Sequence, residues 1–149
     1  MDKEATIESI QKARQVHEEQ MSKIAALISG QSIQDPTALS QRDCLFGQWF
    51  YGNEEHLKRI LGMQFFTKLE ENHSKWHQQY HKIYTIFFSA ESKKQGFFSK
   101  IVGANKVSPL ELDKAKLYYA ELKDNTEELV KIMMACERRI GALSDSKFI

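Results

Sequence analysis

The sequence predicts an all-α fold, a four-helix bundle with a short extra helix that carries a cysteine motif. Apolar residues recur at steps of three and four over three long segments, which is the period of an amphipathic helix. Only two prolines and seven glycines occur in 149 residues, and no Asn-Gly or Asp-Gly hairpin signal is present. A β-sandwich or barrel needs more turns than that. We expect one domain over residues 1–149, with its core over about residues 3–140.

The first long helix is expected over residues 3–29, because its apolar stripe ends just before Gly30, a suitable C-terminal stop. Residues 31–39 read as a loop whose turn is marked by Asp35-Pro36. One position of the stripe carries an imidazole, because His17 follows Ala13 at the helical spacing.

The short helix is expected to open at Ser40, with Asp43 three residues later as a weak capping box. It carries the segment Cys44-Leu45-Phe46-Gly47-Gln48-Trp49-Phe50-Tyr51 and stops near Gly52-Asn53. Cys44 would then lie in the first turn, where the helix dipole favours a thiolate.

Residues 54 to about 92 are expected to form a long helix, bent near Gly62. Its apolar stripe includes His73 and His77. Residues 93–107 read as a connection with an apolar patch, in which a short helical turn is possible.

The last helix has a clear start, because Ser108 is a suitable N-cap, Pro109 takes the first helical position and Glu111 completes a capping box. Its apolar stripe runs to Ile140 and is interrupted at Thr126 alone. We expect the last six residues to fray.

Three histidines on apolar stripes form a candidate metal site together with one cysteine. A neutral imidazole in a core needs polar partners, and the spacing of His73 and His77 places both rings on one side of a helix. His81 extends the pattern by one turn, so it is an alternative ligand, although it lies about 100° from the centre of the stripe. Three histidines and the Cys44 thiolate make a closed tetrahedral set that suits Zn²⁺. Cys136 reads instead as a small buried apolar residue.

Charge and composition exclude several other classes. Lys and Arg total 21 against 20 Asp and Glu, so the basic excess of a nucleic-acid-binding protein is missing. No run of about 18 apolar residues is present, and the N-terminus lacks the apolar segment of a signal peptide. Two cysteines are too few for a disulfide framework, so we expect free thiols and a cytoplasmic location without membrane contact.

The order of these residues resembles the bacterial chemoreceptor zinc-binding (CZB) domain family. That family has a histidine in its first helix, a Cys-x-aromatic/aliphatic-Gly-x-Trp segment and a later HxxxH pair, matched here by His17, the Cys44 segment, and His73 with His77. The resemblance runs from about residue 10 to residue 90. Many members carry an aromatic residue about three positions after the first histidine, where this chain has Gln20.

The resemblance implies a helical bundle that binds one zinc ion through three histidines and one cysteine, in a regulatory protein and not in an enzyme. CZB domains are attached to soluble chemoreceptors or diguanylate cyclases and are associated with sensing zinc or oxidants such as hypochlorous acid through the zinc-bound cysteine. It also implies a homodimer. A chain of 149 residues has no room for an output domain, so we expect the signalling output in a separate partner or in a longer protein.

Three other interpretations compete with this one. A metal-free helical interaction module would need three core histidines satisfied by other partners. A di-iron haemerythrin-like bundle would need more histidines and inward-facing carboxylates, which Glu70 and Glu71 do not clearly supply. An enzyme with Cys44 as nucleophile would need an oxyanion segment that the sequence lacks.

Trp49, Trp76 and nearby tyrosines are expected to pack around the site, where a tyrosine hydroxyl is one candidate to hold a ligand histidine. His56 is expected on the surface.

Overall fold

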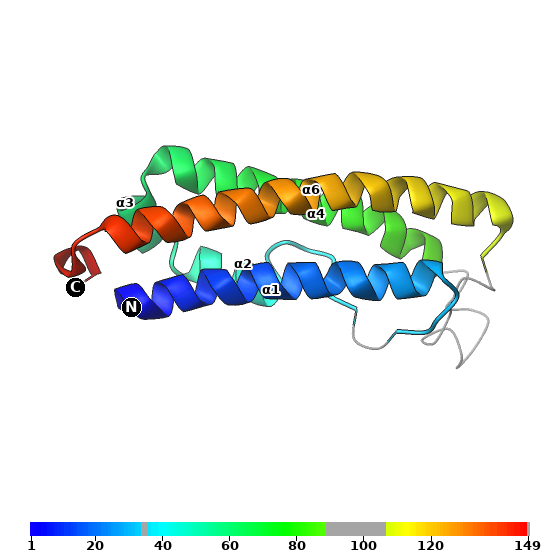
Figure 1. The fold of residues 1–149 in the computed structure, drawn as a ribbon, viewed down its shortest axis with the longest axis horizontal. Coiled ribbons are helices and arrows are strands. Elements are labelled where there is room, and N and C mark those ends of the chain that lie inside the picture. The colour runs from blue at the N-terminus through cyan, green and yellow to red at the C-terminus, as the bar shows by residue number, and fades with distance from the viewer. Residues whose placement is uncertain (34–35, 89–106, 149) are drawn as a thin grey trace.

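The computed structural model describes residues 1–33, 36–88 and 107–148. These residues form helices and no strands, which confirms the predicted all-α helical bundle (Figure 1). The elements are α1 (Lys3–Ile28), α2 (Leu45–Gly52), α3 (Glu54–Leu61), α4 (Met63–Phe88), α6 (Pro109–Ala142) and the 3₁₀ helix η3 (Asp145–Phe148). The predicted turn at Asp35 and, apart from Val107, the predicted connection over 93–107 lie outside the described residues.

Three long helices, α1, α4 and α6, run along the molecule, with α6 antiparallel to the other two (Figure 1). The backbone of α6 packs closely along both α4 and α1, whereas α1 and α4 hardly approach each other. The chain leading to α2 lies against both helices: Tyr80 of α4 donates a hydrogen bond to Thr37 O over 2.9 Å, and Thr37 lines a pocket together with Ala13 of α1. The bundle therefore has three long helices, and α2 with its preceding loop fills the fourth position.

Local capping signals explain where α1 and α6 begin. The Asp2 carboxylate accepts a hydrogen bond from Ala5 N at 2.7 Å, and Ser108 Oγ accepts one from Glu111 N at 3.2 Å. Pro109 occupies the first turn of α6, where its missing N–H costs no hydrogen bond. Gly30 follows α1 with φ at 93°, a conformation that suits glycine after a helix. These two helices match the predicted ranges to within about two residues.

The prediction of one bent helix from residue 54 is wrong, because Gly62 divides the segment into α3 and α4. Its φ of 82° and ψ of 156° lie outside the helical region, so the helix cannot continue through it. Within the described residues the bundle consequently contains five α-helices.

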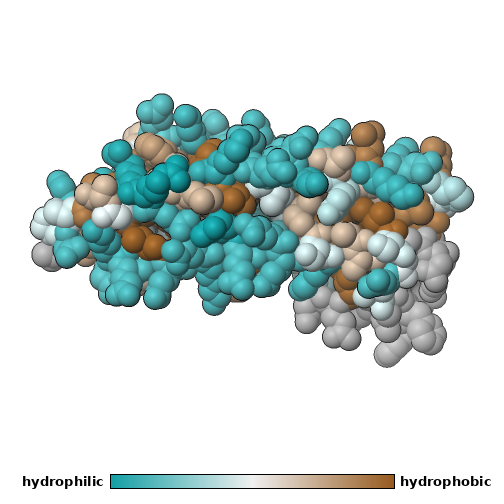
Figure 2. Space-filling model, viewed as in Figure 1, coloured by the Kyte–Doolittle hydropathy of each residue, from teal (hydrophilic) through white to brown (hydrophobic). Residues whose placement is uncertain are grey.

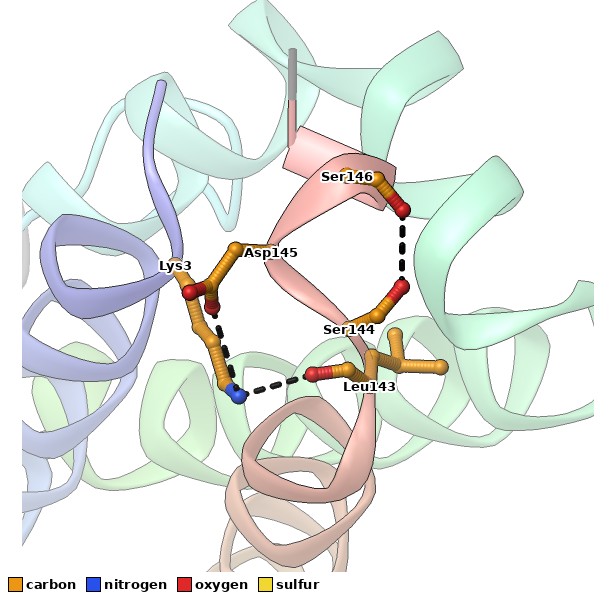
Figure 3. A network of polar contacts seen from close by, with 5 residues as sticks. All are labelled: Lys3, Leu143, Ser144, Asp145 and Ser146. Carbon is orange, nitrogen blue, oxygen red and sulfur yellow. Dashed lines mark hydrogen bonds and ion pairs between the residues drawn. The ribbon is translucent and has the colours of Figure 1, made fainter.

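The prediction of a frayed C-terminus is also wrong over residues 144–148, the described part of the tail. Lys3 Nζ donates a hydrogen bond to Leu143 O over 2.7 Å and lies 3.7 Å from the Asp145 carboxylate, which ties the chain after α6 to the start of α1 (Figure 3). Phe148 is buried at 7% exposure and contacts the ring of His56, with 5.9 Å between ring centroids. His56, expected on the surface, is half-buried for the same reason.

The surface seen in Figure 2 is largely hydrophilic, and apolar residues gather toward the end of the molecule where α6 begins. Leu110 and Leu117, on the first turns of α6, are 66% and 60% exposed. Among the helices of the described residues, none has the length and apolar character that crossing a membrane requires.

Candidate metal centre

The structure brings His17, Cys44, His73 and His77 together in the space between α1 and α4. Each offers one ligand atom, and the four atoms all lie within 4.8 Å of one another. All four residues are buried, with exposed fractions of 1–6%. His81, the alternative ligand, is exposed on the outer side of α4 and is not part of the cluster. We call the four residues the His₃Cys cluster.

The helical spacing of α4 accounts for the closest contact in the cluster. His73 and His77 are one turn apart, so their rings meet on one face, with 3.1 Å between the two Nε2 atoms. Cys44 Sγ lies 3.4 Å from His73 Nε2. Ligands of a tetrahedral zinc ion are separated by roughly 3.3–3.6 Å, as follows from Zn–N and Zn–S bond lengths of about 2.0–2.3 Å. The two separations are close to that range.

Backbone carbonyls orient two of the three histidines. His17 Nδ1 lies 2.7 Å from Ala13 O, and His77 Nδ1 lies 3.0 Å from Leu39 O. A carbonyl can only accept, so each Nδ1 carries the proton and each Nε2 presents a lone pair to the cluster. The expected tyrosine hydroxyl does not take this role in either ring, because the Tyr80 hydroxyl donates to Thr37 O instead.

The ring of His73 is held by packing. Its Nδ1 is buried and has no hydrogen-bond partner among the described residues. The ring meets Phe46 edge to face at 4.8 Å and His17 at 5.2 Å, measured between centroids. These contacts direct Nε2 toward Cys44 and His77.

Cys44 is the N-cap of α2 and does not lie inside its first turn, so the prediction of a helix from Ser40 is wrong. The extended backbone of Cys44, with φ −68° and ψ 155°, precedes the helix, and Sγ accepts a hydrogen bond from Gly47 N at 3.3 Å. The chain before the helix folds back over it, so that a Cβ on Gly47 would lie 1.7 Å from Gln41 O. The glycine of the cysteine motif therefore permits the close approach that positions Cys44.

The buried environment keeps all three imidazoles neutral. Burial, together with the neighbouring histidines, lowers the pKa of His73 to about 2, and burial lowers that of His77 to about 4 and that of His17 below its ordinary value. Neutral imidazole is the form that binds a metal ion.

The Cys44 thiol does not have the low pKa that its place at a helix N-terminus suggests. Burial raises the pKa, and the N–H groups of Gly47 and Phe46 oppose this rise only in part. A nearby divalent cation favours the thiolate much more strongly than these hydrogen bonds do. Three neutral nitrogen donors and one sulfur donor, in a buried site with no carboxylate among them, fit Zn²⁺.

A tryptophan connects the cluster to α6. Trp76 is fully buried, and its ring lies 4.7 Å from that of His17 and 5.0 Å from that of His77, between centroids. Its Nε1 donates to Thr126 Oγ1 at 2.8 Å, and the Thr126 hydroxyl donates to Leu122 O at 2.7 Å. The polar residue that interrupts the apolar stripe of the last helix is thus the buried partner of this indole, a role that its place in the sequence does not indicate.

The fold and the cluster define a class: a helical bundle with a buried His₃Cys site able to hold a metal ion. Residues 17–84, a little under half of the chain, match the family model of the chemoreceptor zinc-binding domain, CZB. The match contains all four residues of the cluster and confirms the resemblance seen in the sequence. Comparisons with curated proteins and with solved structures gave no significant match.

Proposed function

We propose that the chain binds one zinc ion through His17, Cys44, His73 and His77 and acts as a zinc-binding sensory or regulatory domain in bacterial signal transduction. The observation that carries the proposal is the convergence of four buried donor atoms within 4.8 Å inside a segment that matches the CZB family. That family is sensory and not catalytic.

The coordination would join parts of the fold that otherwise have little contact. His17 belongs to α1, His73 and His77 to α4, and Cys44 precedes α2, while the backbones of α1 and α4 hardly approach each other. Zinc bound here would hold α2 against both helices, and the binding free energy would add to the free energy of unfolding. A set of four protein ligands leaves no position for a reactive water, which agrees with a role other than hydrolysis.

Cys44 is the ligand that we propose responds to a signal. A two-electron oxidant such as hypochlorous acid converts a thiolate to a sulfenic acid and releases chloride, which would remove one of the four ligands. Because Cys44 also caps α2, its loss from the site would free the start of this eight-residue helix. Movement of α2 relative to the bundle is then the change that an output domain or partner, in chemotaxis or cyclic-di-GMP control, would detect.

Metal content per chain tests the site. We expect about one zinc per chain in protein purified without chelators or a metal-affinity tag. His73→Ala should lose most of the zinc. His81→Ala is the matched control, because His81 lies on the same helix, eight residues after His73, but is exposed. This variant should keep the zinc. No zinc in the wild-type chain, or equal loss in both variants, would contradict the proposed site.

The proposed response of Cys44 to oxidants needs a separate measurement. Treatment with hypochlorite should release zinc from the wild-type chain and change its circular dichroism or its melting temperature, and Cys44→Ser should bind zinc more weakly from the start. Full zinc affinity in Cys44→Ser together with no structural effect of hypochlorite would rule out the sensing mechanism. Sedimentation of the chain with and without zinc tests the homodimer that we propose for the functional state.

A further inference from the structure

A pocket of about 200 Å³ lies between α1 and the start of α2. Its wall includes two members of the His₃Cys cluster, His17 and Cys44. The remainder is mainly apolar, with Ala13 and Val16 on α1 and Phe46 and Trp49 on α2. We call this the α1–α2 pocket.

The other members of the cluster are less accessible. His73 is 1% exposed and is covered by the rings of Phe46, His17 and His77. A second depression reaches His77 from the side of Leu39 and His81. There the Leu39 carbonyl holds His77 Nδ1, the ring nitrogen that does not face the cluster. The α1–α2 pocket is therefore the depression that leads to Cys44.

We propose that the α1–α2 pocket is the route by which small molecules reach the Cys44 sulfur, and that its wall selects small, uncharged, thiol-reactive molecules. This inference rests on the proposed function, because it concerns how the proposed metal ligand is reached. It adds a binding site for the reagent and names the residues that control access.

The residues that line the pocket determine the size and charge of the molecules that can enter it. A volume of about 200 Å³ accommodates a molecule of a few heavy atoms up to about the size of benzene, which fills an engineered cavity of about 150 Å³. An anion entering a mainly apolar pocket loses water without gaining equivalent hydrogen bonds. The cationic side chain in the wall, Lys12, is exposed, so its charge is screened by solvent.

Val16 and Trp49 control the width of the pocket. Both are half-buried, one on each side, and neither belongs to the His₃Cys cluster. A phenylalanine at position 16 would occupy part of the pocket. The preceding residue, Gln15, is exposed, does not line the pocket and bonds to Glu19 on the surface of α1, so Gln15→Phe is a matched control.

The test is the rate of alkylation of Cys44 in the full chain, followed by mass spectrometry, with the metal content of each sample measured in parallel. With iodoacetamide, sulfur displaces iodide from carbon, an S–C bond forms, and any thiol proton passes to solvent. We expect Val16→Phe to slow alkylation about fivefold or more and Gln15→Phe to change it by less than about twofold, with zinc per chain unchanged in both. Trp49→Ala should accelerate the reaction, which keeps the test valid if Val16→Phe does not fold.

Selection by charge is tested with iodoacetate, which differs from iodoacetamide in its negative charge. The rate of each reagent is divided by its rate with the urea-unfolded chain. We expect iodoacetate to be disfavoured about fivefold or more in the folded chain.

Equal rates in Val16→Phe, Gln15→Phe and the wild type would overturn the access route, and equal normalised rates for the two reagents would overturn the selection. If Cys136, which is fully buried, reacted as fast as Cys44, access would occur by unfolding and the proposal would fail. A chain without zinc would contradict the proposed function but leave the pocket result readable, so the two failures are distinguishable.

Discussion

Replacing Thr126 with valine removes the hydrogen-bond acceptor of Trp76 while keeping the shape of the side chain. The indole Nε1 donates to Thr126 Oγ1 at 2.8 Å, and Trp76 is fully buried, so water cannot take the place of the hydroxyl. Valine and threonine are both β-branched and have similar helix propensities, so neither a cavity nor a large change in helix stability is expected.

The expected decrease in the free energy of unfolding follows from leaving a buried hydrogen-bond donor unpaired. Such a loss costs about 1–3 kcal/mol, and the complete burial of the indole places the estimate at about 2 kcal/mol. For a chain of this length, that corresponds to a decrease in melting temperature of roughly 4–8 °C. Thr126 also donates to Leu122 O within its own helix, and the loss of that second bond has to be measured separately.

Urea unfolding of the zinc-loaded chain provides the measurement, and Thr85→Val provides the control. Thr85 Oγ1 donates to His81 O at 2.8 Å, the same bond to a carbonyl four residues earlier, but on an exposed part of α4. We expect the control to lie within about 0.5 kcal/mol of the wild type. If Thr126→Val destabilises the chain no more than Thr85→Val does, the Trp76 hydrogen bond does not contribute to stability, contrary to this prediction.

Two further predictions concern the surroundings of the cluster. Gly47→Ala should lower the free energy of unfolding by about 3 kcal/mol and weaken zinc binding, because the new Cβ would lie 1.7 Å from Gln41 O; Gly52→Ala, which meets no atom within 4 Å, should do neither. In the presence of a chelator, the free energy of unfolding should be greatest above pH 6.5 and fall by roughly 3 kcal/mol between pH 6.5 and pH 5. In the folded chain His73 and His77 have pKa values of about 2 and about 4, so both stay neutral over this range. In the unfolded chain both histidines gain protons as the pH falls, which stabilises the unfolded state. A urea midpoint independent of pH over this range would contradict that assignment.

The long helices and the residues of the cluster are predictable because local signals encode them. The Ser108 cap and Pro109 mark the start of α6 within a few residues of sequence, and helical periodicity alone places His17, His73 and His77 on apolar faces. The same periodicity placed His81 at the rim, and the structure leaves it exposed. The assignment of zinc to the cluster remains a prediction.

The parts that sequence reasoning missed depend on contacts between distant segments or on the backbone. Gly62 is compatible with either a bend or a break, and the break follows from its positive φ of 82°, a backbone angle that the sequence alone does not specify. Cys44 caps α2 because the preceding chain folds over Gly47. Phe148 is buried through its contact with His56, which is 92 residues away in sequence. The carbonyls that hold two histidine rings belong to Ala13 and Leu39, whose side chains carry no sign of this role.

The positions of the two tryptophans give the chain its own optical reporter. The sequence contains only Trp49 and Trp76; one lines the α1–α2 pocket, and the other contacts the rings of two histidines of the cluster. Tryptophan fluorescence therefore originates entirely next to the His₃Cys cluster. Trp76 samples the buried side, and the half-buried Trp49 samples the side open to solvent. Metal exchange and movement of α2 should thus be observable in real time without an added label, and substituting either indole separates the two signals.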